Sequence, residues 1–181
     1  PYTTLFRSLK HLDPTLKYNR EKKSEIKLSL FFKEESEYYK NRLQKNSIDF
    51  TIFLEDDFSI SINRGKIVQI IDNLISNSEY WLIKLKGNDP NCKPSITIKI
   101  ESPWIYFYDN GYGISPAIEN MLFEPFVTTK PKGEGRGLGL FIIQQLLDSS
   151  KCTIALEPFR NEHGRKYIFA INFSNIINEY K

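Results

Sequence analysis

The chain has 181 residues, of which 40% are hydrophobic and 26% are charged, and its formal net charge is +3. These values are typical of one soluble globular domain, and the small charge, with lysines spread along the chain, leads us to expect no nucleic-acid partner. No apolar run approaches the length of a membrane span and no signal peptide is visible. Cys92 and Cys152 have neither metal nor disulfide spacing, which favours a reducing, cytoplasmic location.

The first residues of the chain differ in character from the rest. The chain does not begin with Met, and residues 1–8 (PYTTLFRS) resemble the translation of a common sequencing adaptor. We therefore expect a non-native segment and a missing upstream region, which could anchor the parent protein in a membrane. Polar residues 9–25 are expected to be a connector, residues 26–174 the domain, and residues 175–181 a C-terminal tail.

Hydrophobic periodicity predicts a helix and then a β-hairpin at the start of the domain. Residues 26–46 place apolar side chains at helical spacing among many charges, and the helix is expected to begin near Ser29. Residues 48–54 and 58–62 alternate between apolar and polar side chains, as strands do. The Asp-Asp pair between them suits a tight turn, so the two strands are predicted to be neighbours.

Asn63 can cap a long helix, in which apolar residues recur from Ile67 to Leu85. Beyond it the patterns predict four strands, a short helical turn and one more helix. The strands are expected at residues 95–101, 104–108, 153–156 and 167–173, the turn at 118–122, and the helix from the glycine-rich run to about Ser149. This order predicts an α+β two-layer sandwich, a mixed sheet covered by helices on one face.

The most glycine-dense stretch is GEGRGLGL, at residues 133–140. Glycine lets the backbone approach an anion and point N–H groups at it, and the N-terminus of the following helix adds unpaired N–H groups. The pattern indicates a phosphate-binding segment. Its spacing is neither that of a P-loop nor that of a dinucleotide fingerprint, so by itself it names no ligand.

Three other stretches carry polar groups in a suggestive order. Asn73 and Asn77 are four residues apart and project from one face of the long helix. Asp109 opens the sequence DNGYGI directly after a strand, and residues 122–130 read LFEPFVTTK. Taken singly, these stretches are consistent with surface asparagines, an ordinary turn and a loop with aromatic anchors.

Together, and in this order, the four stretches resemble the ATP-binding domain of the Bergerat-fold superfamily, which includes sensor histidine kinases, type II topoisomerases, mismatch-repair ATPases and heat-shock chaperones. Phe-Glu-Pro-Phe, then Thr-Thr-Lys, then Gly-Leu-Gly-Leu is most similar to the histidine kinase branch. The resemblance implies a catalytic domain that uses ATP and Mg²⁺ to phosphorylate a histidine outside this chain. It also implies a phosphoacceptor helix or response regulator as partner, and a homodimer formed through missing upstream helices.

The resemblance assigns roles to individual residues. Asn77 matches the Mg²⁺ ligand, Asp109 matches the aspartate that accepts a hydrogen bond from the adenine amino group, and Lys130 is placed to meet the terminal phosphate. A solvated loop lysine is the alternative for Lys130. Phe123 and Phe126 are expected to anchor the base of a lid to the core. Further nucleotide contacts are expected from Gly111, Gly113, Thr129, Gly135, Gly137, Leu138 and Gly139.

Asn73 stands where the hydrolysing branches of the superfamily carry a glutamate that activates water, and histidine kinases typically have Asn there too. An amide cannot act as a general base, so Asn73 and Lys130 are expected to serve phosphoryl transfer, in which positioning and charge stabilisation supply most of the catalysis. The nearest carboxylates, Asp72 and Glu79, are expected to lie off the Asn73 and Asn77 face.

An alternative function stays open: an ATP-gated switch or weak ATPase module of a larger ATP-binding protein, in which residues 128–136 close over the nucleotide. Tyr80 and Trp81 leave room for this function, because they depart from the histidine kinase pattern, in which a Lys and a Tyr often follow the asparagine motif. Neither His11 nor His163 has the context of a phosphoacceptor, so the acceptor is expected outside this chain.

Overall fold

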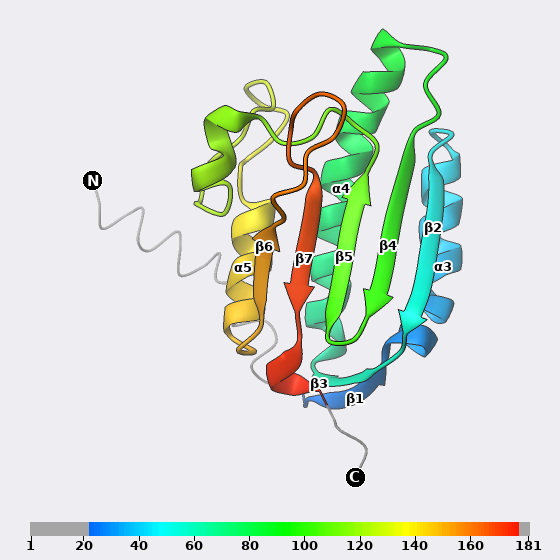
Figure 1. Ribbon diagram of the computed structural model, residues 1–181, viewed down its shortest axis with the longest axis vertical. Coiled ribbons are helices and arrows are strands. Elements are labelled where there is room, and N and C mark those ends of the chain that lie inside the picture. The colour runs from blue at the N-terminus through cyan, green and yellow to red at the C-terminus, as the bar shows by residue number, and fades with distance from the viewer. Residues whose placement is uncertain (1–21, 178–181) are drawn as a thin grey trace, which may run out of the picture.

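Five strands form one mixed sheet in the order β2-β4-β5-β7-β6 (Figure 1). The structure is a computed structural model that describes residues 22–177. The strands are β2 (Asp49–Asp56), β4 (Ser95–Glu101), β5 (Trp104–Asp109), β6 (Thr153–Leu156) and β7 (Ile168–Asn172). Strands β2 and β4 are parallel and the other neighbours are antiparallel. The predicted mixed sheet is confirmed.

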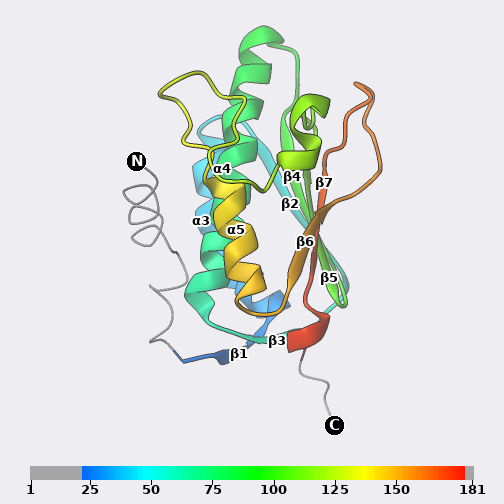
Figure 2. The same ribbon diagram turned by 90° about the vertical axis from the view of Figure 1, so that its left-hand side faces the viewer.

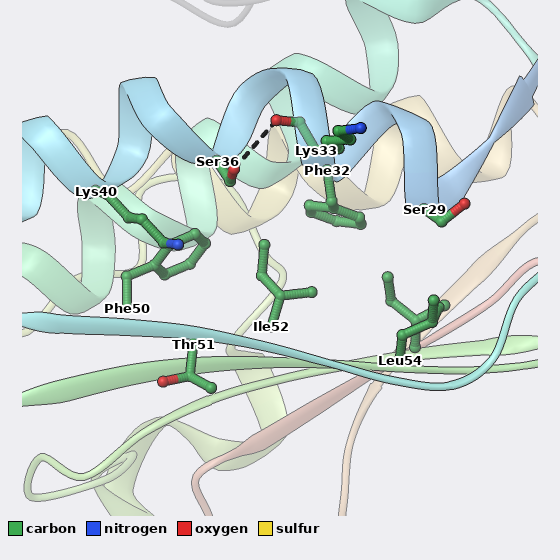
Figure 3. A pocket seen from close by; sticks show the side chains of 10 residues that line it. Ser29, Phe32, Lys33, Ser36, Lys40, Phe50, Thr51, Ile52 and Leu54 are labelled. Atoms are coloured by element: carbon green, nitrogen blue, oxygen red, sulfur yellow. Dashed lines mark hydrogen bonds between the residues drawn. The ribbon is translucent and has the colours of Figure 1, made fainter.

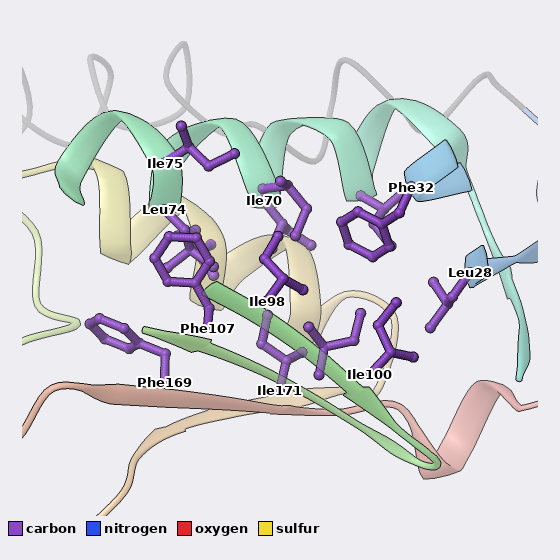
Figure 4. Packing of buried hydrophobic residues seen from close by; sticks show 14 of the residues in the cluster. Leu28, Phe32, Ile70, Leu74, Ile75, Ile98, Ile100, Phe107, Phe169 and Ile171 are labelled. Carbon is purple, nitrogen blue, oxygen red and sulfur yellow. The ribbon is translucent and has the colours of Figure 1, made fainter. Parts of the chain in front are cut away.

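The helices α3 (Leu28–Gln44), α4 (Arg64–Asn88) and α5 (Gly139–Asp148) all cover the same face of this sheet, as Figure 2 shows from the side. Apolar side chains fill the space between the two layers. In Figure 4, Ile70 and Leu74 of α4 face Ile98 and Phe107 of the sheet, and all four are at most 1% exposed. Burying one such side chain contributes about 1.5–3 kcal/mol. The two-layer sandwich follows from this packing, as predicted.

Helix α4 carries much of the site and has a well-defined start. The side chain of Asn63 accepts hydrogen bonds from the backbone N–H groups of Gly65 and Lys66, at 2.8 and 3.3 Å. These bonds satisfy donors that the first turn of a helix leaves unpaired, so the predicted cap is confirmed. The helix runs to Asn88, past the Gly87 at which a loop was expected.

The predicted β-hairpin is wrong. Strand β2 pairs with β4, whereas β3 (Ser59–Ile62) pairs antiparallel with β1 (Ser24–Lys27) in a separate two-stranded sheet. The turn between β2 and β3 explains the difference. The Asp57 carboxylate accepts from the N–H of Ser29 at 3.0 Å, and the carbonyl of Phe58 accepts from the N–H of Leu28 at 3.0 Å. The turn thus holds the start of α3, and the chain leaves β2 instead of folding back along it.

The limits of the domain also differ from the prediction. Ser24 and Glu25 belong to β1, so the expected connector ends before them. Its first part, the expected adaptor-derived segment 1–8 and residues 178–181 lie outside the described residues. At the other end, the 3₁₀ turn η2 (Ser174–Ile176) precedes Ile177, which forms a bridge with Ile60, so the domain extends past residue 174. Among residues 22–177 no helix is both long and apolar enough to cross a membrane.

Candidate functional site

The start of α5 packs against the asparagine face of α4. A Cβ atom placed on Gly139 would lie 3.3 Å from Nδ2 of Asn77 and 3.5 Å from Oδ1 of Asn73. The N-cap residue of α5, Leu138, makes no capping side-chain hydrogen bond, and the first turn of α5 contains no acidic residue. The N–H groups at this helix end, together with the helix dipole, therefore suit an anion placed beside the two amides.

The two asparagines are held differently. Nδ2 of Asn73 donates to the carbonyl of Gln69 at 2.9 Å, a bond within the helix that sets the direction of the amide. Oδ1 of Asn77 accepts from Nζ of Lys130 at 3.4 Å, across 53 residues of sequence. Asn77 therefore lies next to two other predicted site residues, Lys130 and Gly139, with its amide oxygen facing a cation.

Asp109 ends β5 beside α4. One carboxylate oxygen accepts from the hydroxyl of Ser78, the residue after Asn77, and the other accepts from the N–H of Gly111 at 2.9 Å. Burial raises the pKa of Asp109 above its ordinary value of 3.8, and the two hydrogen bonds lower it in part. Ser78 was not singled out from the sequence, because a serine inside a helix has no distinctive pattern.

The turn after Asp109 rests on the loop between β6 and β7. Nδ2 of Asn161 donates to the carbonyl of Gly111 at 3.1 Å, and the N–H of Ile114 donates to the carbonyl of Lys166 at 2.8 Å. Gly113 has a φ of +77°, and a Cβ there would lie 2.9 Å from Lys166 O. Gly113 is therefore required by the packing of these two loops, whatever it does for a ligand. Asn161 is a supporting residue that the sequence did not indicate.

The lid, residues 128–136, leaves and rejoins the domain at one point. The N–H of Phe126 donates to the carbonyl of Gly137 at 2.8 Å. Gly137 has a φ of +65°, and a Cβ there would lie 2.5 Å from the carbonyl carbon of Phe126, so only glycine fits. Of the remaining predicted nucleotide contacts, Thr129 and Gly135 lie in the lid, and Gly137 and Leu138 lie between the lid and α5.

The two phenylalanines before the lid behave differently. Phe123 packs against the core, with its ring centroid 6.4 Å from that of Phe169, so its predicted anchoring role is confirmed. Phe126 is 50% exposed, and the same prediction is wrong for it. Its backbone has a positive φ of 68°, and its N–H forms the bond to Gly137 that closes the base of the lid.

The two neighbouring carboxylates lie off the Asn73 and Asn77 face, as expected, and the structure shows that they face α3. Glu79 accepts from Nη2 of Arg42 at 2.6 Å and from Nδ2 of Asn46 at 3.0 Å. Asp72 lies beside Tyr39, whose pKa is raised by burial and then by this carboxylate. Both acids are therefore used in the contact between α3 and α4, away from the Asn73 side chain.

A separate hollow of about 470 Å³ lies between α3 and β2. Phe32 of α3 and Ile52 of β2 point into it (Figure 3), and Lys33 and Lys40 also line it. It shares no residue with the predicted nucleotide site, so the two regions are distinct surfaces of the domain.

Comparison with known proteins identifies the family. Residues 62–175 match the family of histidine kinase-, DNA gyrase B- and HSP90-like ATPases, and the chain belongs to it. The two-component sensor PprA of Pseudomonas aeruginosa is 34% identical over 88 residues, which are 45% of this chain and 9% of that protein. The sensor protein kinase PilS of the same species is 28% identical over 139 residues, 76% of this chain and 25% of that one. This chain therefore spans only a small part of such relatives.

Solved structures agree with this assignment. The catalytic domain of the histidine kinase ThkA superposes with a TM-score of 0.64 at 25% identity, covering 85% of this chain and 97% of that one. The mycobacterial sensor histidine kinase MprB shares the fold, with a TM-score of 0.67 at 15% identity, covering 87% and 99%. The chain thus matches the ATP-binding catalytic domain of sensor histidine kinases, and the resemblance stated from its motifs is confirmed.

Proposed function

We propose that this domain binds Mg·ATP between α4, the start of α5 and the lid, and transfers the γ-phosphate to a histidine outside the chain. The observation that carries the proposal is the contact of Gly139 with Asn73 and Asn77 at the start of α5. Helix N–H groups suit the phosphates there, and amide oxygens suit a magnesium ion. In the transfer, the bond from the γ-phosphorus to the β–γ bridging oxygen breaks, a phosphorus–nitrogen bond forms, and ADP leaves.

Asp109 would select the base. Its carboxylate, held by Ser78 and Gly111, would accept a hydrogen bond from the exocyclic amino group of adenine. Guanine presents a carbonyl at that position and would face a buried carboxylate without a proton between them, so adenine is favoured. Gly111 and Gly113 would bring the backbone of the turn close to the base.

Asn77 fits the magnesium ion by the chemistry of its donor atom. A neutral amide oxygen is a hard ligand, and phosphate oxygens and waters would complete the coordination. When bound, the ion offsets the negative charge of the phosphates. Lys130, beside Asn77, would neutralise charge on the terminal phosphate, while Thr129, Gly135, Gly137 and Leu138 would enclose the phosphates.

Asn73 favours transfer over hydrolysis, because its amide cannot take a proton from water. We infer that its role is to position the phosphates or the metal's water ligands. The acceptor histidine would lie on a helix of the parent protein, with a homodimer formed through its upstream helices and a response regulator receiving the phosphoryl group. A cytoplasmic location, with any membrane anchor upstream, fits such a protein.

An ATP-gated switch is the second candidate. The observation that favours it is the direct contact of the lid with α4, between Lys130 and Asn77. Nucleotide binding could break this contact and so change the position of the lid. In that case the lid would change its contacts with a partner, with little turnover.

The complete parent protein, incubated with γ-labelled ATP and Mg²⁺, distinguishes the two. The kinase predicts label on protein that is labile in acid and stable in alkali. ATP binding without protein-bound label would contradict the kinase and support the switch. Absence of ATP binding in the wild-type chain would contradict both.

A further inference from the structure

The side chain of Tyr80 lies under the lid lysine. Nζ of Lys130 is 4.2 Å from the centroid of the Tyr80 ring, within the range of a cation–π interaction. Tyr80 follows Asn77 by three residues on α4, so both side chains share one face of the helix. The ammonium group therefore sits between a ring face and the Asn77 amide oxygen, 3.4 Å from that oxygen.

The other end of Tyr80 holds a second point of the lid. Its hydroxyl donates to the carboxylate of Glu134, and the same carboxylate forms an ion pair with Lys84 at 3.4 Å. Lys84 lies one turn beyond Tyr80 on α4, with its own Nζ 5.6 Å from the ring. One side chain of α4 thus contacts both arms of the lid, at Lys130 and at Glu134.

The lid backbone also restricts where Lys130 can go. A Cβ on Gly135 would lie 2.8 Å from Cδ of Lys130, so the glycine leaves space for the lysine stem. The N–H of Lys130 donates to Oγ1 of Thr128 at 3.1 Å, which fixes the turn from which the stem leaves. The stem therefore lies between Gly135 and Tyr80, and its ammonium reaches Asn77.

We propose that Tyr80 is a positioning residue that seats Lys130 beside Asn77 and, through Glu134, holds the lid against α4 before nucleotide arrives. The expected effect on ATP binding rests on the proposed function, whereas the placement of Lys130 by Tyr80 does not. The cation in this contact comes from the lid and lies above the tyrosine ring. When Mg·ATP binds, Nζ of Lys130 leaves the amide oxygen of Asn77 and contacts the terminal phosphate instead.

The placement of Lys130 by Tyr80 is tested without nucleotide or metal, by timed trypsin digestion of the 181-residue chain. Cleavage after Lys132 or Arg136 reports lid opening. Tyr80→Leu is expected to speed this cleavage about fivefold, the size of one cation–π contact, and Tyr80→Phe, which keeps the ring, less than that. Tyr38→Leu removes an exposed tyrosine of α3 and serves as the matched control. Equal cleavage rates in wild type and Tyr80→Leu would show that Tyr80 does not hold the lid against α4.

The effect on ATP is tested by a double-mutant cycle, with affinity measured by displacement of a fluorescent ATP analogue in Mg²⁺ and in EDTA. Tyr80→Leu is expected to weaken Mg·ATP binding about fivefold in the wild-type background and less than twofold in Lys130→Met, because Tyr80 acts through Lys130. Equal losses in both backgrounds overturn the positioning role. If the wild-type chain binds no ATP, the proposed function fails, while the digestion still tests whether Tyr80 holds Lys130 and the lid against α4.

Discussion

Replacing Asp109 by Asn separates the role of this residue in ATP binding from its role in folding. The change keeps the size of the side chain and removes one acceptor oxygen and the charge. The N–H of Gly111 cannot turn away, so the remaining oxygen is expected to stay with it, at the present 2.9 Å. The hydroxyl of Ser78 can rotate and accept from the new amide. Folding should therefore tolerate the change.

The expected loss of ATP affinity is about 10- to 100-fold. A hydrogen bond to a charged group contributes about 1.5–3 kcal/mol, and each 1.4 kcal/mol is a factor of ten in affinity. In the variant the amide NH₂ group would face either Ser78 or the amino group of adenine, and two donors cannot pair. The affinity for ATP should fall more than the affinity for GTP, because the carbonyl of guanine could accept a hydrogen bond from the new amide. The difference in affinity between the two nucleotides should therefore become smaller.

The stability of the same variant depends on pH in a definite direction. Burial raises the pKa of Asp109, so the folded chain holds this proton more tightly than the unfolded chain does. The contribution of Asp109 to stability is therefore fully present below its ordinary pKa of 3.8 and is lost as the pH rises through the raised folded value. Asn carries no such charge. The free energy of unfolding of Asp109→Asn, relative to wild type, should thus improve between pH 4 and pH 7.

Urea unfolding at the two pH values, together with displacement of a fluorescent ATP analogue at pH 7, checks both parts. Ser78→Ala is the matched control, since it removes a partner of the carboxylate and leaves the charge in place. Unchanged ATP affinity in a folded Asp109→Asn variant would refute the adenine assignment. A relative stability that falls from pH 4 to pH 7 would refute the argument from burial.

Three other substitutions probe the metal, the lid and the helix start. Asn77→Ala should bind ATP equally well with Mg²⁺ and with EDTA; an affinity still raised by Mg²⁺ would mean that the metal has another ligand. Gly137→Ala should lose about 1–3 kcal/mol of stability in urea unfolding, because φ is +65° and the new Cβ meets Phe126, and a stability equal to wild type would contradict that strain. Asn63→Ala should lose about 1 kcal/mol through the α4 cap, and an unchanged unfolding midpoint would show that the cap bonds contribute nothing.

Local pattern was sufficient for most elements of this fold. The apolar spacing that predicted α4 and α5 reflects which side of each helix is buried, and that is a property of neighbouring residues. Asn63 as a cap likewise follows from the residues next to it. Strand partners are different: the alternation of β2 and β3 says that each has an inner face, but not which strand lies beside it. Contacts of the intervening turn with Ser29 and Leu28 decided that question.

The predicted site residues likewise divide into those that local pattern could find and those that it could not. Asn73, Asn77, Asp109 and the glycines could be found in the sequence, because their order and spacing form a pattern that a family shares. By itself the sequence thus determined the type of domain and its predicted ligand groups.

Only the tertiary structure brought Lys130 onto Tyr80 and Asn77, joined Ser78 to Asp109, and left Phe126 exposed. These contacts join residues that are 31 to 53 positions apart, as in the bonds of Ser78 to Asp109 and of Asn77 to Lys130. No local period records such pairs. They are set by how the lid and the strand ends pack on α4, which depends on the whole core beneath them.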